Sequence, residues 1–145
     1  MEQTPARLMA LPSWLLTQTA THTHRLVQEE LARSGARGHH YRVLATLEEF
    51  GPASQATVGR HAGVHLSDVV AALNELAELD LVERAPDPQD RRRNVITITP
   101  AGRRQLKKLD KRLAEAQEEL LAPLSPEERE QFTQVLARLL SHHER

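Results

Sequence analysis

The chain contains no cysteine, which excludes disulfide bonds, thiolate metal sites and cysteine nucleophiles. Aromatic residues are also scarce: the 145 residues include one tryptophan, one tyrosine and two phenylalanines, so aliphatic side chains must fill the core. No apolar run approaches the roughly 20 residues of a membrane-spanning helix. Residues 1–20 lack the basic start and uninterrupted apolar core of a signal peptide. We therefore expect a cytoplasmic protein that has no membrane partner.

Sequence motifs for catalysis are missing as well. The chain has no Gly-x-Ser-x-Gly elbow, no phosphate-binding loop and no His-Glu-x-x-His pair. We therefore expect no catalytic residues and no cofactor. The length suits one domain with its own core.

Positive charge is concentrated in one short segment. The whole chain has a net charge of −1, but residues 84–112 carry +7, whereas residues 1–83 and 113–145 carry −4 each. Such a segment is typical of a phosphate-binding surface. A solvated basic face without a partner is the alternative.

The middle of the chain predicts two helices joined by a tight turn. Ser54 is a suitable N-cap for a helix over 55–62, Gly63-Val64 forms the turn, and apolar residues at steps of three and four from Leu66 to Ala77 indicate the next helix. This order is the helix-turn-helix pattern. Before it, we expect a long helix capped by Ser13 and ending near Gly35, and another over 39–50.

A β-hairpin is predicted directly after the helix-turn-helix. Residues 81–84 and 95–99 read as strands. Residues 85–94 include two prolines and three consecutive arginines, which predict an exposed basic tip. The fold class is therefore mainly α with a small β-hairpin, an α+β winged helix-turn-helix.

The C-terminal part predicts two further helices. Thr99-Pro100 is an N-cap followed by proline at the first helical position. The helix that follows carries a heptad seam, which suits a coiled coil or packing on the chain's own helices: Leu106, Leu109, Leu113, Ala116 and Leu120. Ser125-Pro126-Glu127-Glu128 then forms a capping box for a last helix.

The sequence resembles the MarR family of bacterial regulators over most of its length. The motifs that carry the resemblance are Asp90-Arg91-Arg92, Ile98-Thr99-Pro100-Ala101-Gly102, the Ala62-Gly63-Val64 turn, and Leu73, Leu76 and Leu79-Asp80-Leu81-Val82. The resemblance implies one MarR-type domain over 1–145, with dimerisation helices at 1–37 and 113–145 and a winged-helix lobe at 38–112. It also implies a homodimer, a recognition helix over 66–79 and a wing over 84–98. Many members carry a basic residue where this chain has Val70-Ala71-Ala72.

The expected DNA contacts follow from these positions. The resemblance implies that Arg91 enters the minor groove and that Asp90 and Arg92 form the wing ion pair. Arg84 and Arg93 are candidates for phosphate contacts, with general solvation as the alternative, and Arg92 is also counted among the DNA-binding residues. His65, Ser67 and Asp68 begin the recognition helix, where side chains face base edges; helix capping is the alternative, preferred for Asp68. Ser54 and Gln55 begin the preceding helix, whose amides can hold a phosphate.

Small-molecule and metal sites are weaker expectations. The resemblance implies an effector cleft, for which Trp14, His22, His39 and Tyr41 are candidates; ordinary core packing is the preferred alternative for these side chains. Eight histidines are present, but neighbouring pairs such as His39 and His40 do not share a helix face. We therefore predict no metal site, and keep a zinc-responsive regulator as the alternative.

The function predicted from all this is sequence-specific binding of double-stranded DNA. We expect a homodimer that acts as a repressor on a pseudo-palindromic operator, with a small-molecule effector that relieves repression. A winged-helix protein-interaction module is the competing class, although it would not need three consecutive arginines at the wing tip.

Overall fold

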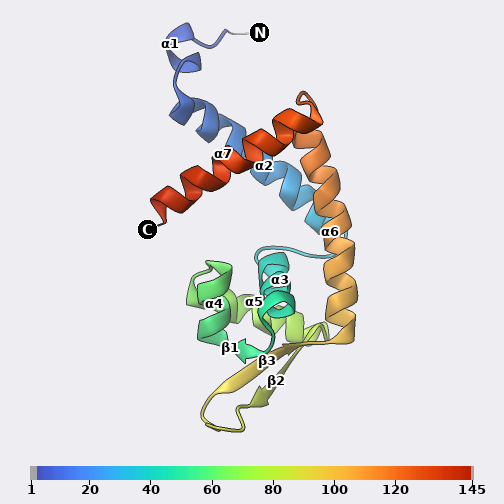
Figure 1. The fold of residues 1–145 in the computed structure, drawn as a ribbon. Coiled ribbons are helices and arrows are strands. Elements are labelled where there is room, and N and C mark those ends of the chain that lie inside the picture. The colour runs from blue at the N-terminus through green and yellow to red at the C-terminus, as the bar shows by residue number, and fades with distance from the viewer. Residues whose placement is uncertain (1–2, 145) are drawn as a thin grey trace. The chain divides into compact units, whose positions relative to one another are not determined.

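The computed structural model describes residues 3–144, which form seven helices and three short strands (Figure 1). In chain order these are α1 (Ala6–Met9), α2 (Pro12–Ala32), α3 (His40–Phe50), β1 (Ala53–Ser54), α4 (Gln55–Ala62), α5 (Leu66–Glu78), β2 (Val82–Pro86), β3 (Asn94–Ile98), α6 (Pro100–Leu120) and α7 (Pro126–His143). The predicted combination, mainly α with a small β-hairpin, is confirmed. No helix in the described part of the chain combines the length and apolar character needed to cross a bilayer.

The chain divides into two compact units. One contains the two ends of the chain, up to Leu26 and from Ala114 onward, and the other is Val27–Leu113. We call them the terminal unit and the central unit. The central unit contains α3, α4, α5 and the sheet, and in it the β2–β3 hairpin extends away from the three helices (Figure 1).

The sheet has three antiparallel strands in the order β1-β3-β2. β3 is central: Ile96 lies opposite both Ala53 of β1 and Arg84 of β2. The sequence did not indicate β1, because two residues carry no alternation of their own. β1 exists only because β3 offers it a partner.

The first wing strand, β2, is longer than predicted because it includes Pro86. β2 continues through Ala85 and Pro86, and Pro86 pairs with Asn94, so the prediction that the tip begins at residue 85 was wrong. β2 is an edge strand, where a residue without an N–H group can be tolerated. The tip is therefore shorter than expected, spanning residues 87–93.

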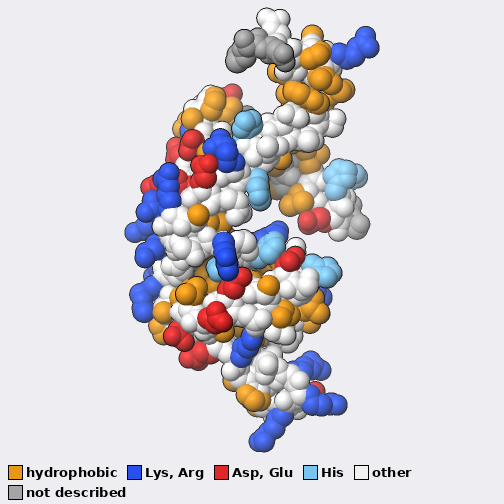
Figure 2. Space-filling model, turned by 180° about the vertical axis from the view of Figure 1, so that it is seen from behind, with side chains coloured by type: hydrophobic (Ala, Val, Ile, Leu, Met, Phe, Trp, Pro, Cys, Tyr) orange, Lys and Arg blue, Asp and Glu red, His pale blue; other side chains and the backbone are white. Residues whose placement is uncertain are grey.

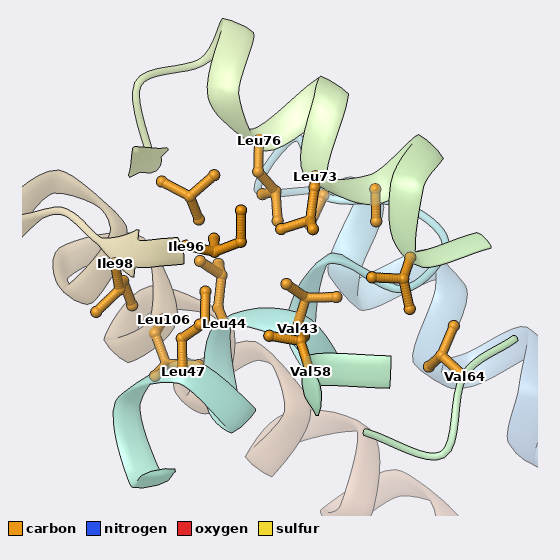
Figure 3. Packing of buried hydrophobic residues seen from close by; sticks show 14 of the residues in the cluster. Val43, Leu44, Leu47, Val58, Val64, Leu73, Leu76, Ile96, Ile98 and Leu106 are labelled. Carbon is orange, nitrogen blue, oxygen red and sulfur yellow. The ribbon is translucent and has the colours of Figure 1, made fainter. Parts of the chain in front are cut away.

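The core of the central unit is aliphatic. Buried side chains from α3, α4, α5, β3 and α6 meet in one cluster (Figure 3), which includes Val43, Leu44, Leu47, Val58, Leu73, Leu76, Ile96, Ile98, Leu106 and Leu109. The two N-terminal leucines of the predicted heptad seam thus pack on the chain's own helices. Further along α6, Ala116 is buried in the terminal unit.

Helix starts mostly follow the local signals. The Ser125 hydroxyl accepts the Glu128 N–H, and the Glu128 side chain accepts the Ser125 N–H, which confirms the capping box. Ser13 does not cap α2, because Pro12 already occupies the first helical position. Proline fits there, since that position needs no N–H donor. The short helix α1 was not predicted.

The terminal unit exposes much apolar surface. Within the described residues of α7 none is buried. Exposed large hydrophobic side chains occur on both stretches of the unit: Met9, Leu11, Leu15, Leu16, Phe132, Val135, Leu139 and Leu140. The turn between α6 and α7 is held by Arg129, whose guanidinium donates to the Leu121 and Leu124 carbonyls and to Glu118. These apolar faces have no partner within one copy of the described chain.

Candidate nucleic-acid interface

The helix-turn-helix corner has a tightly defined geometry. The Ser54 hydroxyl accepts the Thr57 N–H at 3.3 Å and so caps α4. Gly63 ends α4 with φ of +65°, in the left-handed region that favours glycine. Gly59 lets α4 and α5 approach closely, because a Cβ there would lie 3.2 Å from the Val64 carbonyl oxygen and from Val69 Cγ2. Gln55, the first residue of α4, is partly buried.

His65 is the N-cap of α5. Its Nδ1 accepts the Ser67 N–H at 3.3 Å and lies 2.9 Å from Ser67 Oγ. An Nδ1 that accepts an N–H carries no proton, so the ring presents its Nε2–H as a donor. The N-cap of α5 is therefore a histidine, whereas the sequence favoured Asp68 for helix capping. Asp68 lies in the first turn of α5, where a carboxylate suits the helix dipole.

The outer face of α5 is uncharged along most of its length. Ser67, Ala71 and Asn74 follow one another at helical spacing and are exposed. Leu66, the first of the apolar residues whose spacing predicted this helix, is 53% exposed at its tip. An exposed leucine at a helix tip is available for an apolar contact outside the protein.

A guanidinium reaches this face from β2. Arg84 Nη2 donates to Asn74 Oδ1 at 2.6 Å. The side chain supplies the positive charge that Val70-Ala71-Ala72 lack. Sequence reasoning missed Asn74, and no local pattern marked it, because the pairing depends on β2 lying beside α5.

The wing tip is organised around Asp90. Its Oδ1 accepts from Arg92 Nε and from the Arg92 N–H, both at 3.1 Å, and Oδ2 lies 3.6 Å from Arg93 Nε. Hydrogen bonds from the Arg92 side chain and backbone hold the pKa of Asp90 below its usual value. Asp90 and Arg92 therefore form an ion pair in a closed turn, in which Asp87 N–H donates to the Arg93 carbonyl at 2.9 Å.

Arg91 is the exception at the tip. It is exposed and makes no hydrogen bond or ion pair with any residue of 3–144. The tip thus holds Arg92 and Arg93 against Asp90 and leaves one guanidinium available. At the lower end of the molecule in Figure 2, Lys and Arg side chains surround the hairpin.

A cleft of about 310 Å³ lies between the start of α3 and α5, and Ala71 links it to the outer face of α5. It is lined by Arg37, Gly38, His39, His40, Asp68, Ala71, Ala72 and Glu75. His40 Nε2 lies 2.7 Å and Arg37 Nε 3.1 Å from Glu75 Oε2. These bonds, that from Arg37 first, hold the pKa of Glu75 below its usual value. The network ties the start of α3 to the middle of α5.

The four candidate ligand residues do not share a unit. Trp14 and His22 lie on α2 in the terminal unit, His39 and Tyr41 in the central unit. His39 Nε2 faces Asp68 Oδ2 at 3.8 Å, whereas the Tyr41 hydroxyl donates to Asp110 at 2.6 Å. Burial, followed by that hydrogen bond, raises the pKa of Tyr41 to about 12. Within residues 3–144 no three His, Asp or Glu side chains are grouped closely enough to hold a metal ion.

Comparison with known proteins identifies the family. Residues 34–93 match the model of the MarR family. The HTH-type transcriptional regulator YxaD of Bacillus subtilis (strain 168) is 30% identical over 114 residues, which are 79% of this chain and 80% of YxaD. The chain belongs to the MarR family.

Solved structures show that the match extends over the whole MarR fold. A probable transcriptional regulator from Pseudomonas aeruginosa is 30% identical, with a TM-score of 0.80 over 91% of this chain and 98% of that one. PcaV from Streptomyces coelicolor, solved in complex with its natural ligand, is 26% identical, with a TM-score of 0.78 over 97% and 98%. The predicted winged helix-turn-helix and its role in transcription regulation are thus confirmed.

Proposed function

We propose that this MarR-family chain is a homodimeric repressor that binds a pseudo-palindromic operator. Its two α5 helices would enter successive major grooves about 10 base pairs apart, and its wings the flanking minor grooves. The observation that carries the proposal is the wing tip, where Asp90 holds two arginines and leaves Arg91 unpaired. A free guanidinium on an exposed tip fits the negative potential of a minor groove.

The other proposed DNA contacts are made to base edges by residues at the start of α5 and to phosphates by arginines. Ser67 and Leu66 are exposed and would read base edges, the serine by hydrogen bonding and the leucine by contact with a thymine methyl. The Nε2–H of His65 is a further donor on the same helix tip. Arg84, Arg92 and Arg93 bind phosphates.

Two further residues complete the phosphate contacts. Ser54 and Gln55 place the first amides of α4 against the backbone of the DNA. The Ser54 hydroxyl is engaged in capping, so its contribution is to orient these amides.

The first experiment selects the operator. Purified protein is mixed with random-sequence duplexes, and the bound fraction is amplified and sequenced. Enrichment of a two-fold symmetric site with half-sites about one helical turn apart supports the proposal. Enrichment of no duplex, or of a site without symmetry, contradicts it.

The second experiment tests Arg91 on the selected duplex. Arg91→Ala should weaken binding by about 1–3 kcal/mol, a factor of roughly 5 to 150, because a desolvated groove contact is lost. Fluorescence anisotropy measures the affinity and sedimentation equilibrium the oligomeric state, which should not change. Arg7→Ala, which removes an exposed arginine from α1, is the control and should bind normally. An Arg91→Ala affinity equal to that of the control would refute the minor-groove role.

The apolar faces of the terminal unit support dimerisation. Four large side chains of α7 are 36–58% exposed, and monomers seldom leave such a stripe uncovered. Leu139→Glu should therefore produce monomers in sedimentation equilibrium and weaken operator binding, because two half-sites are no longer linked. Gln134→Glu adds the same charge to α7 at a polar exposed position and should remain dimeric. Dimers of Leu139→Glu would contradict this interface.

A small-molecule effector is the regulatory part of the proposal. PcaV was solved with its natural ligand, and this chain has the same fold. Such a ligand would act by favouring a dimer geometry whose α5 spacing no longer fits DNA. No observation favours the zinc-responsive or protein-interaction alternatives, and a DNA-binding regulator fits a cytoplasmic location.

The single tryptophan offers a direct probe of the effector. Trp14 is partly buried on α2, so its fluorescence can report ligand binding. Small aromatic acids titrated into the protein should change this fluorescence and release the selected duplex. A compound that changes neither signal is not the effector.

A further inference from the structure

A row of cations occupies the outward face of α6. Arg104, Lys107, Lys108 and Lys111 are exposed, and none of their side chains makes a hydrogen bond or ion pair with any residue between 3 and 144. Their spacings of three and four place them on one face, opposite the buried core leucines of the helix. Lys and Arg side chains line the left edge of Figure 2, the side on which α6 stands. We call these four residues the α6 stripe.

Repulsion among the cations of the α6 stripe destabilises the protein when no partner is bound. Lys107 and Lys111 are four residues apart, as are Arg104 and Lys108, and like charges at this spacing repel. The first turn of α6 has no acidic residue that would offset these cations.

Two nearby acids are engaged by other side chains, whereas Glu115, four residues after Lys111, offers an opposite charge at one end of the stripe. Glu48 Oε2 accepts from Arg103 Nε at 3.0 Å, and the Asp110 carboxylate accepts the Tyr41 hydroxyl. Four adjacent cations that repel one another suit a partner that carries a regular row of negative charges.

The stripe is rigidly connected to the wing. β3 ends at Ile98 and α6 begins at Pro100, and both belong to the central unit. Thr99 fixes the junction, since its hydroxyl donates to the Asp80 carbonyl at 2.7 Å and accepts the Gly102 N–H at 3.0 Å. A duplex bound by the wing therefore meets α6 as part of the same body.

We propose that the α6 stripe binds phosphates of duplex DNA that flanks the operator, so that the bound DNA continues past the wing along α6. The inference rests on the proposed function. From Arg104 to Lys111 the helix rises about 10 Å, which matches the axial length of about three base pairs. The stripe recognises the backbone of the flank and reads no sequence.

The test compares two lengths of the selected duplex. One is trimmed to about 20 base pairs, enough for two half-sites, and the other carries about 15 unrelated base pairs on each side. The variant Lys107→Gln/Lys108→Gln is measured beside Arg7→Gln/Arg138→Gln, which removes the same charge from α1 and α7. Anisotropy titrations over a range of salt give affinities and salt slopes.

We expect the stripe variant to bind the short duplex within about twofold of the parent protein and to lose about tenfold or more on the long one. Its salt slope on the long duplex should fall by about 3 to 4, for four cations in a dimer. The control variant should keep the preference for the long duplex. The thermal midpoint of the stripe variant should be unchanged or higher, because like charges are removed.

Other results overturn the inference. Equal losses on both duplexes would place the stripe against the operator itself, and no loss on either would show that the stripe does not bind the duplex. A lower thermal midpoint would show that the lysines stabilise the fold. Failure of the parent protein to bind even the short duplex is a different result, because it would refute the proposed function.

Discussion

Gly102→Ala should damage the junction between the wing and α6. Gly102 lies in the first turn of α6, and its N–H donates to the Thr99 hydroxyl. A Cβ at this position would overlap the Leu81 carbonyl oxygen and lie 2.7 Å from Ile98 Cγ1 and 3.1 Å from the Leu81 carbonyl carbon. The Leu81 carbonyl cannot move freely, because it accepts the Thr99 N–H at 3.1 Å. α6 must therefore shift away from the start of β2.

The magnitude follows from two opposing effects. Alanine is favoured over glycine within a helix by about 1 kcal/mol. Forcing a methyl group into a filled site usually costs about 1–3 kcal/mol, and more where the neighbour is backbone. For Gly102 we expect the clash to dominate, with a net loss of about 2 kcal/mol in the free energy of unfolding. For a chain of this size the thermal midpoint would fall by about 4–8 °C.

Urea denaturation and thermal melting at one fixed protein concentration measure the effect. Gly59→Ala is the control, because a Cβ at Gly59 would lie 3.2 Å from its nearest neighbours, a milder contact than at Gly102. The helix preference for alanine should offset this small strain. We expect the control to differ from the parent by less than about 1 kcal/mol. A Gly102→Ala protein as stable as the parent would refute the reasoning, since it would show that the junction can relax without loss.

Two titratable contacts give further predictions. The only tyrosine, Tyr41, has its pKa raised to about 12. A pH titration followed by the ultraviolet absorbance of tyrosinate should therefore have its midpoint well above the unfolded value of about 10. Asp110→Asn should lower this midpoint but leave it above about 10, because burial is the larger cause of the shift. An unchanged midpoint in Asp110→Asn would contradict the assignment. Glu75 has its pKa lowered by Arg37 and His40, so its contribution is present above the unfolded value of about 4.3 and is lost as pH falls through the folded one. Glu75→Gln should therefore be less stable than the parent in urea at neutral pH, with the difference shrinking in acid; a difference that grows in acid would show that the network does not stabilise the charged carboxylate.

Local signals were enough to place the helix-turn-helix. Ser54, Gly63 and Ser125 act within one turn of their own position, because capping and left-handed turns involve neighbouring backbone groups. The order of elements and the resemblance to the MarR family then gave the fold and the role in regulation. The predicted helix start at Ser13 was wrong, because the neighbouring Pro12 already begins the helix. Proline prefers the first helical position more strongly than serine prefers the N-cap here.

Contacts between distant segments were decided only by the tertiary structure. β1 is a strand because β3 lies beside it, and Pro86 is tolerated because β2 is at the sheet edge. Arg84 bonds to Asn74 because β2 lies next to α5. These pairings depend on how elements pack in space, which capping and periodicity do not encode. The sequence by itself determined the long helices, the two wing strands and where most of them begin, since those choices are made by neighbouring residues. Packing decided whether β1 forms, which side chains stay paired and which, like Arg91, are left available.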